Sequence, residues 1–418
     1  MIKVKLGVVR GGALYVGALI GPGLLLIPAL AVQAAGPASI IAWVGLLILS
    51  APLAITFAAL AVRYPVAGGV AAYVQAGLGD AAAAVTGAWF VAAIVVGGPA
   101  VSLIGGYYVA DLTATGSEVA IAVAVAMFAT VLATNALGLR VSSTVQLALS
   151  AILVGVLAVA ITIALGRLDV AAWTPFAPHG WWAVGTAANI LIWLFVGWEA
   201  VAQLVGDFRR PDVDLPRAMG LAFGVVSVLY VGLAVVTVTV NAGAASRVPL
   251  ADLVAVGFGR VGRDVTAVLA VALTMGTMNV YMGGGAKLVG ALAAAGAMPP
   301  WLRDRRRRTV PLRPLAVFAL LGVLLLAALA GGLLNVNDLI RGTSSLFVGV
   351  YVLAIASAVR ILHGRARLAA LAAMVMVGAI ALFSGWYAAL PVGVAFLSLL
   401  QWTYSKSRLR SATISLLT

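Results

Sequence analysis

Apolar residues fall in twelve stretches along the chain, separated by charged or turn-forming residues. Each stretch has about the twenty residues that a helix needs to cross a hydrocarbon layer of ~30 Å. The stretches lack the alternation of barrel strands, and open sheet edges are excluded in lipid, so the pattern predicts helices. The predicted spans lie at roughly 8–33, 39–62, 82–110, 118–138, 144–166, 183–205, 217–241, 265–295, 314–333, 337–360, 367–384 and 386–404.

No long linker interrupts these spans, so we expect one polytopic domain over residues 1–418. The first stretch follows basic residues and resembles a signal peptide, but it is too long and contains Gly21, Pro22 and Gly23 at its middle, so we interpret it as a retained span. The expected fold class is an all-α membrane protein.

Composition supports this interpretation, because 64% of the residues are hydrophobic, only 9% are charged, and the mean hydropathy is +1.15. A soluble domain cannot hide that much apolar surface. Cysteine is absent, which excludes disulfides and thiolate metal sites. The two histidines, His179 and His363, fall in predicted loops, so we expect no metal site and no cofactor.

The net charge of +14 is distributed unevenly across the predicted spans. Twenty of the 26 basic residues fall on one side, and Lys287 falls within a span. By the positive-inside rule, both termini face the cytoplasm, and we expect a multi-pass protein of the plasma (inner) membrane. The basic run at 303–308 is interpreted as an anchor on anionic lipid, and nucleic acid is not needed to explain it. The basic residues expected on the opposite side are Arg167, Arg247, Arg260, Arg263 and Arg341.

Two of the spans contain residues that break helices. Span 1 reads GALIGPG at 17–23, and span 6 reads FVGWE at 195–199. Glycine and proline disfavour a continuous helix. Non-helical backbone at membrane depth is tolerated only where it lines a cavity or is buried in protein. Each break alone is also compatible with a simple packing kink.

The two breaks stand five spans apart, so they occupy the same place in two successive five-helix units. An odd number of spans inverts the second unit relative to the first. Interrupted helices at matching positions of inverted repeats indicate a substrate site near the bilayer midplane. Free amides at the start of a half-helix suit a carboxylate, and free carbonyls suit an ammonium group. The pattern therefore predicts a transporter of a zwitterion such as a small amino acid.

Four motifs in order resemble those of the amino acid–polyamine–organocation permease superfamily. They are GALIGPG in span 1, YPVAGGVAAYVQAGLG at 64–79, FVGWE in span 6 and DFRRPDVDLPRAM at 207–219. The length and the VGGPA stretch at 96–100 are most similar to the branch that exports methionine and branched-chain amino acids. The resemblance implies about twelve helices in a LeuT-like 5+5 inverted repeat, with discontinuous helices 1 and 6. Repeat one covers about 8–166, repeat two about 183–360, and two C-terminal helices about 367–404.

The resemblance also implies a binding site. In span 1 the substrate carboxylate is expected at Ile20, Gly21, Pro22 and Gly23. In span 6 the amino group is expected at the carbonyls of Phe195, Val196 and Gly197, with Phe195 and Trp198 gating or walling the pocket. Candidates for the side-chain pocket in spans 3, 8 and 10 are Gly97, Gly98, Met275, Met278, Ser344 and Ser345. This set is mostly apolar, which suits an aliphatic or thioether side chain.

Two charged residues are predicted within spans. Glu199 is interpreted either as a proton-coupling or gating carboxylate or as a brace that accepts hydrogen bonds from nearby amides. Lys287 either reaches toward the cytoplasmic surface or faces the pathway. Thr274 and Thr277 are candidates for a sodium site, although such hydroxyls more often bond their own backbone. We favour H⁺ over Na⁺ as the coupling ion.

The expected substrate is a neutral, hydrophobic amino acid such as methionine, leucine, isoleucine or valine, moved by export or proton-coupled exchange. The alternatives are an uptake permease or exchanger for other amino acids, including cationic ones, or for polyamines. An enzyme is disfavoured because no paired carboxylates or metal cluster lie near the predicted site, and a passive channel because no filter sequence is evident. The expected partners are the amino acid and membrane lipid; both a monomer and a homodimer stay open.

Overall fold

A computed structural model describes residues 5–64, 69–139, 143–199, 205, 208–240, 246–303 and 310–417, with residues 143 and 408–417 described by backbone alone. Several parts of the sequence patterns lie outside these residues: positions 65–68 of the motif at 64–79, positions 200–204 of span 6, Asp207, and the arginines at 305–308. Among the described residues the one extended pairing is an isolated bridge between Leu6 and Phe208. The prediction of an all-α protein is confirmed.

Ten helical segments of the described residues are long and apolar enough to cross a membrane, and the first runs from Ile27 to Arg63. The helices that contain these segments, apart from the broken ones, are α3 (Ser39–Arg63), α5 (Asp80–Leu112), α6 (Ser117–Ala136), α7 (Ser143–Leu165), α9 (Pro211–Val240), α10 (Pro249–Ala294), α11 (Leu312–Ala330), α12 (Val336–Ile361), α13 (Gly364–Leu382) and α14 (Ala389–Leu417). Short 3-10 helices connect some of them: η2 (Gly36–Ala38), η3 (Val170–Trp173), η6 (Pro300–Leu302) and η7 (Gly385–Ala388).

Of the two remaining predicted spans, span 1 is interrupted as the sequence predicts, and the helix of span 6 stops within the predicted span. Span 1 consists of α1 (Val8–Leu19), a 3-10 turn η1 (Pro22–Leu25) and α2 (Ile27–Ala35). Span 6 begins with α8 (Trp182–Leu191) and η4 (Ile192–Phe195), and its helix ends there. The inverted relation between the two halves of the chain stays a prediction.

Two helical segments were wrongly assigned to loops by the sequence patterns. The loop motif at 64–79 contains α4 (Gly69–Leu78), a helix too short to span a membrane. The predicted loop before span 8 is the first part of α10, which bends at Gly259, where φ is 58°. Asp252 and Asp264 therefore lie on a helix rather than in a loop. Short segments of mixed polarity carry too little periodicity to separate helix from loop.

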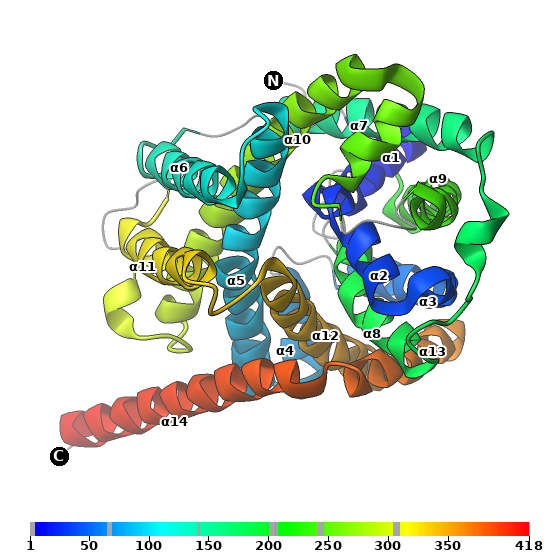
Figure 1. Cartoon of the computed structure of the whole chain (residues 1–418). Coiled ribbons are helices and arrows are strands. Elements are labelled where there is room, and N and C mark those ends of the chain that lie inside the picture. Colours follow the sequence, from blue (N-terminus) through cyan, green and yellow to red (C-terminus); the bar gives the residue numbers. More distant parts are fainter. Residues whose placement is uncertain are drawn as a thin grey trace.

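The helix α5 runs through the middle of the bundle and packs against α10 and α12 (Figure 1). The helices α1, α2, α3, α8 and α9 gather on one side of it, and α6 and α11 on the other. The helix α14 extends beyond the rest of the bundle. Outward faces carry exposed apolar side chains, such as Val228, Val375 and Leu324, as expected of helices that face lipid.

Candidate functional site

The helix of span 1 stops at Leu19, and Ile20 adopts an extended conformation. At the start of η1, Pro22 has no amide hydrogen and the amide of Gly23 has no acceptor within the 3-10 helix, whereas the amide of Leu24 donates to the carbonyl of Gly21 at 3.2 Å. A Cβ atom built on Gly21 would meet no heavy atom within 4 Å. The break therefore combines the Gly23 amide donor with open space at Gly21, at the place where the substrate carboxylate is expected.

In span 6 the helix ends at Phe195, and Val196 is extended. Gly197 has a φ of 139°, a conformation that other residues rarely adopt. A Cβ at Gly197 would lie 3.0 Å from the carbonyl oxygen of Ala18, and a Cβ at Gly23 would lie 2.8 Å from Cδ2 of Leu194. Each break thus packs against the other, and glycine permits the close approach.

Tyrosines from neighbouring helices donate hydrogen bonds to carbonyls beside the breaks. The Tyr230 hydroxyl on α9 lies 3.0 Å from the carbonyl oxygen of Leu19 and 2.9 Å from that of Leu194. Tyr108 on α5 donates to Leu25, at 2.8 Å. Neither tyrosine was predicted from the sequence. The available signal was a tyrosine within an apolar span, since a buried tyrosine hydroxyl usually has a partner.

The Glu199 side chain is buried at the second break and accepts hydrogen bonds there. Its Oε2 accepts from the amide of Gly197 at 3.1 Å and from the Tyr351 hydroxyl on α12 at 2.8 Å. The same hydroxyl lies 3.5 Å from the carbonyl oxygen of Phe195. These contacts match the bracing role considered for Glu199, and they attach α12 to the broken backbone.

Two aromatic residues predicted to wall the pocket are fully buried. Phe195 packs against Trp43 and Tyr230, with ring centroids 6.1 and 5.1 Å apart. Trp198 lies beside Tyr15, at 6.2 Å between ring centroids. The side chains of Phe195 and Trp198 thus pack the second break against the surrounding helices.

Of the two candidate glycines in span 3, Gly97 faces the second broken helix. A Cβ built there would lie 3.3 Å from Cη2 of Trp193 on η4 and 3.4 Å from Cγ2 of Thr343 on α12. Gly98 instead lies against Cε of Met282 on α10. Trp193 and Thr343 were not predicted, because neither differs in the sequence from an ordinary core residue.

The candidates in span 8 have other neighbours. Thr274 is buried and donates to the carbonyl of Ala270 at 2.8 Å, as hydroxyls in apolar helices commonly do. Thr277 accepts from Gln146 on α7, at 3.2 Å. Met278 is buried and Met275 half-buried, whereas Lys287 is exposed on α10. Their roles in binding and coupling stay predictions.

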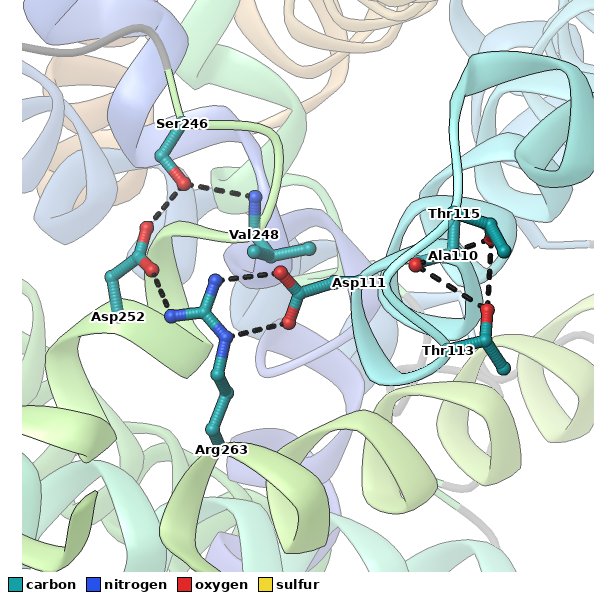
Figure 2. A network of polar contacts seen from close by, with 8 residues as sticks. All are labelled: Ala110, Asp111, Thr113, Thr115, Ser246, Val248, Asp252 and Arg263. Atoms are coloured by element: carbon teal, nitrogen blue, oxygen red, sulfur yellow. Dashed lines mark hydrogen bonds and ion pairs between the residues drawn. The ribbon is translucent and has the colours of Figure 1, made fainter. Parts of the chain in front are cut away.

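A second polar group lies at the end of α5 near Leu112, on the side that the charge pattern assigns to the outside. Figure 2 shows Arg263 between two carboxylates, with Nε and Nη2 at 2.7 and 2.6 Å from Asp111 and Nη1 at 2.8 Å from Asp252. Ser246 donates to Asp252 and accepts from the amide of Val248. We call Asp111, Ser246, Asp252 and Arg263 the outer cluster. It joins α5 to both sides of the bend in α10.

Comparisons with known proteins agree with this architecture. The model of the family described as amino acid permease matches residues 6–404. An uncharacterized amino acid permease of Bacillus subtilis, YecA, is 33% identical over 93% of this chain and 92% of its own length. The L-methionine/branched-chain amino acid exporter YjeH of Escherichia coli is 30% identical over 92% of this chain and 93% of its own. The branched-chain amino acid permease BcaP of Bacillus subtilis is 27% identical over 55% of this chain and 53% of its own. The family match covers nearly the whole chain and agrees with its helices that are long and apolar enough to cross a membrane, so this chain belongs to the amino acid permease family.

Proposed function

We propose that this membrane protein exports or exchanges neutral, mainly hydrophobic amino acids across the plasma membrane by alternating access, coupled to H⁺. The observation that carries the proposal is the meeting of the two breaks, with open space at Gly21 near the amide of Gly23, which has no acceptor within η1. An α-carboxylate can accept a hydrogen bond from this amide. The carbonyls of the second break suit the α-amino group.

The side-chain end of the site favours a neutral substrate. Trp193 and Gly97 offer apolar surface, and the Glu199 carboxylate is already engaged by Tyr351 and Gly197. A cationic side chain would need another carboxylate, because burying an unpaired charge is costly. The exporter of methionine and branched-chain amino acids among the relatives supports the same substrate class.

Counterflow in proteoliposomes tests this proposal. Vesicles are loaded with unlabelled leucine, and uptake of labelled leucine, methionine, valine, lysine and putrescine is measured. We expect leucine, methionine and valine to exchange, and lysine and putrescine to stay at the level of empty vesicles. Exchange of lysine or putrescine without leucine would overturn the assignment.

A further inference from the structure

A groove lies on the surface of the bundle between α7 and α10, beside the end of α5, and has a volume of about 420 Å³. Among the described residues that line it, Asp264 is the one polar side chain, and the apolar ones include Leu112, Leu149, Ile152, Val265 and Val268. The side chains of Ile152, Val265 and Val268 are 53%, 56% and 63% exposed. Apolar side chains this exposed on membrane-crossing helices face lipid.

The groove is a gap in an otherwise close contact between α7 and α10, which pack against each other (Figure 1). Before the gap, a Cβ atom built on Gly257 would lie 2.5 Å from Cδ1 of Ile163 on α7. Beyond the gap, a Cβ atom built on Gly276 would lie 2.5 Å from Oε1 of Gln146 on the same helix. Helices that meet this closely on both sides of a gap leave a defined space for one molecule of the surrounding membrane.

The length and position of the groove match one leaflet of the membrane. Along α10 the groove extends from Asp264 to Ala272, eight residues later, which is about 12 Å of helix rise. Asp264 directly follows Arg263 of the outer cluster, on the side that the charge pattern assigns to the outside. Because half of the hydrocarbon core is about 15 Å thick, the polar end lies at the outer headgroups and the apolar part lies beside acyl chains.

The polar end of the groove carries one exposed charge of each sign. Asp264 is 45% exposed, and Arg260, one turn earlier on α10, is 89% exposed with its Nε 3.9 Å from the Asp264 carboxylate. The neighbouring Arg263 is already bound to Asp111 and Asp252. A headgroup with a phosphate and a primary ammonium group complements the exposed pair, because the phosphate can accept from Arg260 and the ammonium can donate to Asp264.

We propose that this groove binds a phospholipid with a phosphoethanolamine headgroup, one acyl chain of which lies between α7 and α10. A phosphoglycerol headgroup brings no cation to Asp264. A phosphocholine headgroup brings a cation that has no hydrogen to donate. The lipid with the primary ammonium group is therefore preferred over both.

Native mass spectrometry of the purified protein, freed of lipid in detergent, tests the proposal. Phospholipids with identical acyl chains and phosphoethanolamine, phosphocholine or phosphoglycerol headgroups are titrated separately, and the bound lipids are counted by mass. We expect one phosphoethanolamine lipid to bind about three- to fivefold more tightly than the other two, the range for an ion pair at an exposed carboxylate. Equal affinities for the three headgroups would overturn the proposal.

Two variants separate the headgroup contact from the acyl contact. Asp264→Asn keeps the shape of the side chain and should abolish the preference for phosphoethanolamine over phosphocholine. Ala272→Phe fills the apolar end of the groove and should weaken binding of all three lipids about tenfold, because the acyl chain loses its contact with the helices. The matched control is Val280→Phe on the same helix, since Val280 is 52% exposed but does not line the groove. It should bind lipid as the wild type does.

Two further results would contradict the proposal. If Ala272→Phe and Val280→Phe bind lipid equally well, no acyl chain lies in the groove. If the wild type is a dimer that Ala272→Phe converts to a monomer, a second copy of the chain covers the groove instead of lipid. The headgroup comparison on the wild type decides even where a variant does not fold, and none of these measurements depends on transport.

Discussion

The outer cluster and the residues around the two breaks are both polar regions among apolar helices. They differ in how many of their polar atoms have hydrogen-bond partners. In the outer cluster, Arg263 makes three hydrogen bonds and both of its carboxylate partners are engaged. Near the breaks, the hydroxyls of Tyr15 and Thr343 have no partner among the described residues. Full pairing makes a permanent contact between helices, whereas unpaired groups leave bonds for a ligand.

Of the substitutions considered, Gly197→Ala should have the largest effect on the region where the two breaks meet. The residue has a φ of 139°, and the added methyl group would lie 3.0 Å from the Ala18 carbonyl oxygen. Strain of about 1–3 kcal/mol is expected, enough to slow leucine exchange roughly 5- to 150-fold. The exchange rate in proteoliposomes measures the effect.

Gly21→Ala is the matched control for this change, because the backbone there is extended and a Cβ meets no atom within 4 Å. We expect thermal stability like that of the wild type, with weaker substrate binding because the methyl group occupies the open space. A wild-type exchange rate in Gly197→Ala would contradict the model of two apposed breaks.

Glu199→Gln sharpens the comparison by removing a charge while keeping an oxygen that can accept from Gly197. Leucine exchange, which needs no net proton movement, should stay within about threefold of wild type, since the lost charge is replaced by a neutral hydrogen bond. Leucine transport driven by an imposed pH gradient should be lost. Gradient-driven transport equal to wild type would leave Glu199 with the bracing role alone.

Arg263→Gln should have the smallest effect on transport but a clear one on stability. The change leaves Asp111 and Asp252 facing each other without their shared cation, at a cost of about 1–3 kcal/mol for these partly exposed groups. We expect the unfolding temperature of the purified protein to fall by about 1–3 °C while leucine affinity is unchanged.

Arg260→Gln provides the control, since Arg260 has the same charge on the same helix and is 89% exposed, 3.9 Å from Asp264. It should leave the unfolding temperature unchanged. An equal decrease in both variants would mean that charge alone, rather than the outer cluster, is responsible.

The sequence was sufficient for the apolar spans and for both breaks, because glycine, proline and run length are local signals. Trp193, Tyr230 and Thr343 were missed, since a side chain within an apolar run gives no sign of which helix it faces. Arg263 was recognised only as a basic residue on the sparsely charged side. Its partner Asp111 stands 152 residues away, and no local pattern connects them.

The hydroxyl of Tyr230 has one proton and two acceptors, the carbonyl oxygens of Leu19 and Leu194, at nearly equal distances. If the two broken helices move apart, the proton can follow one acceptor and release the other. Moving the two broken helices apart would then cost only part of the hydrogen bonding of Tyr230. This smaller cost lowers the free-energy barrier to the motion. A single side chain can in this way join two moving helices without locking them together.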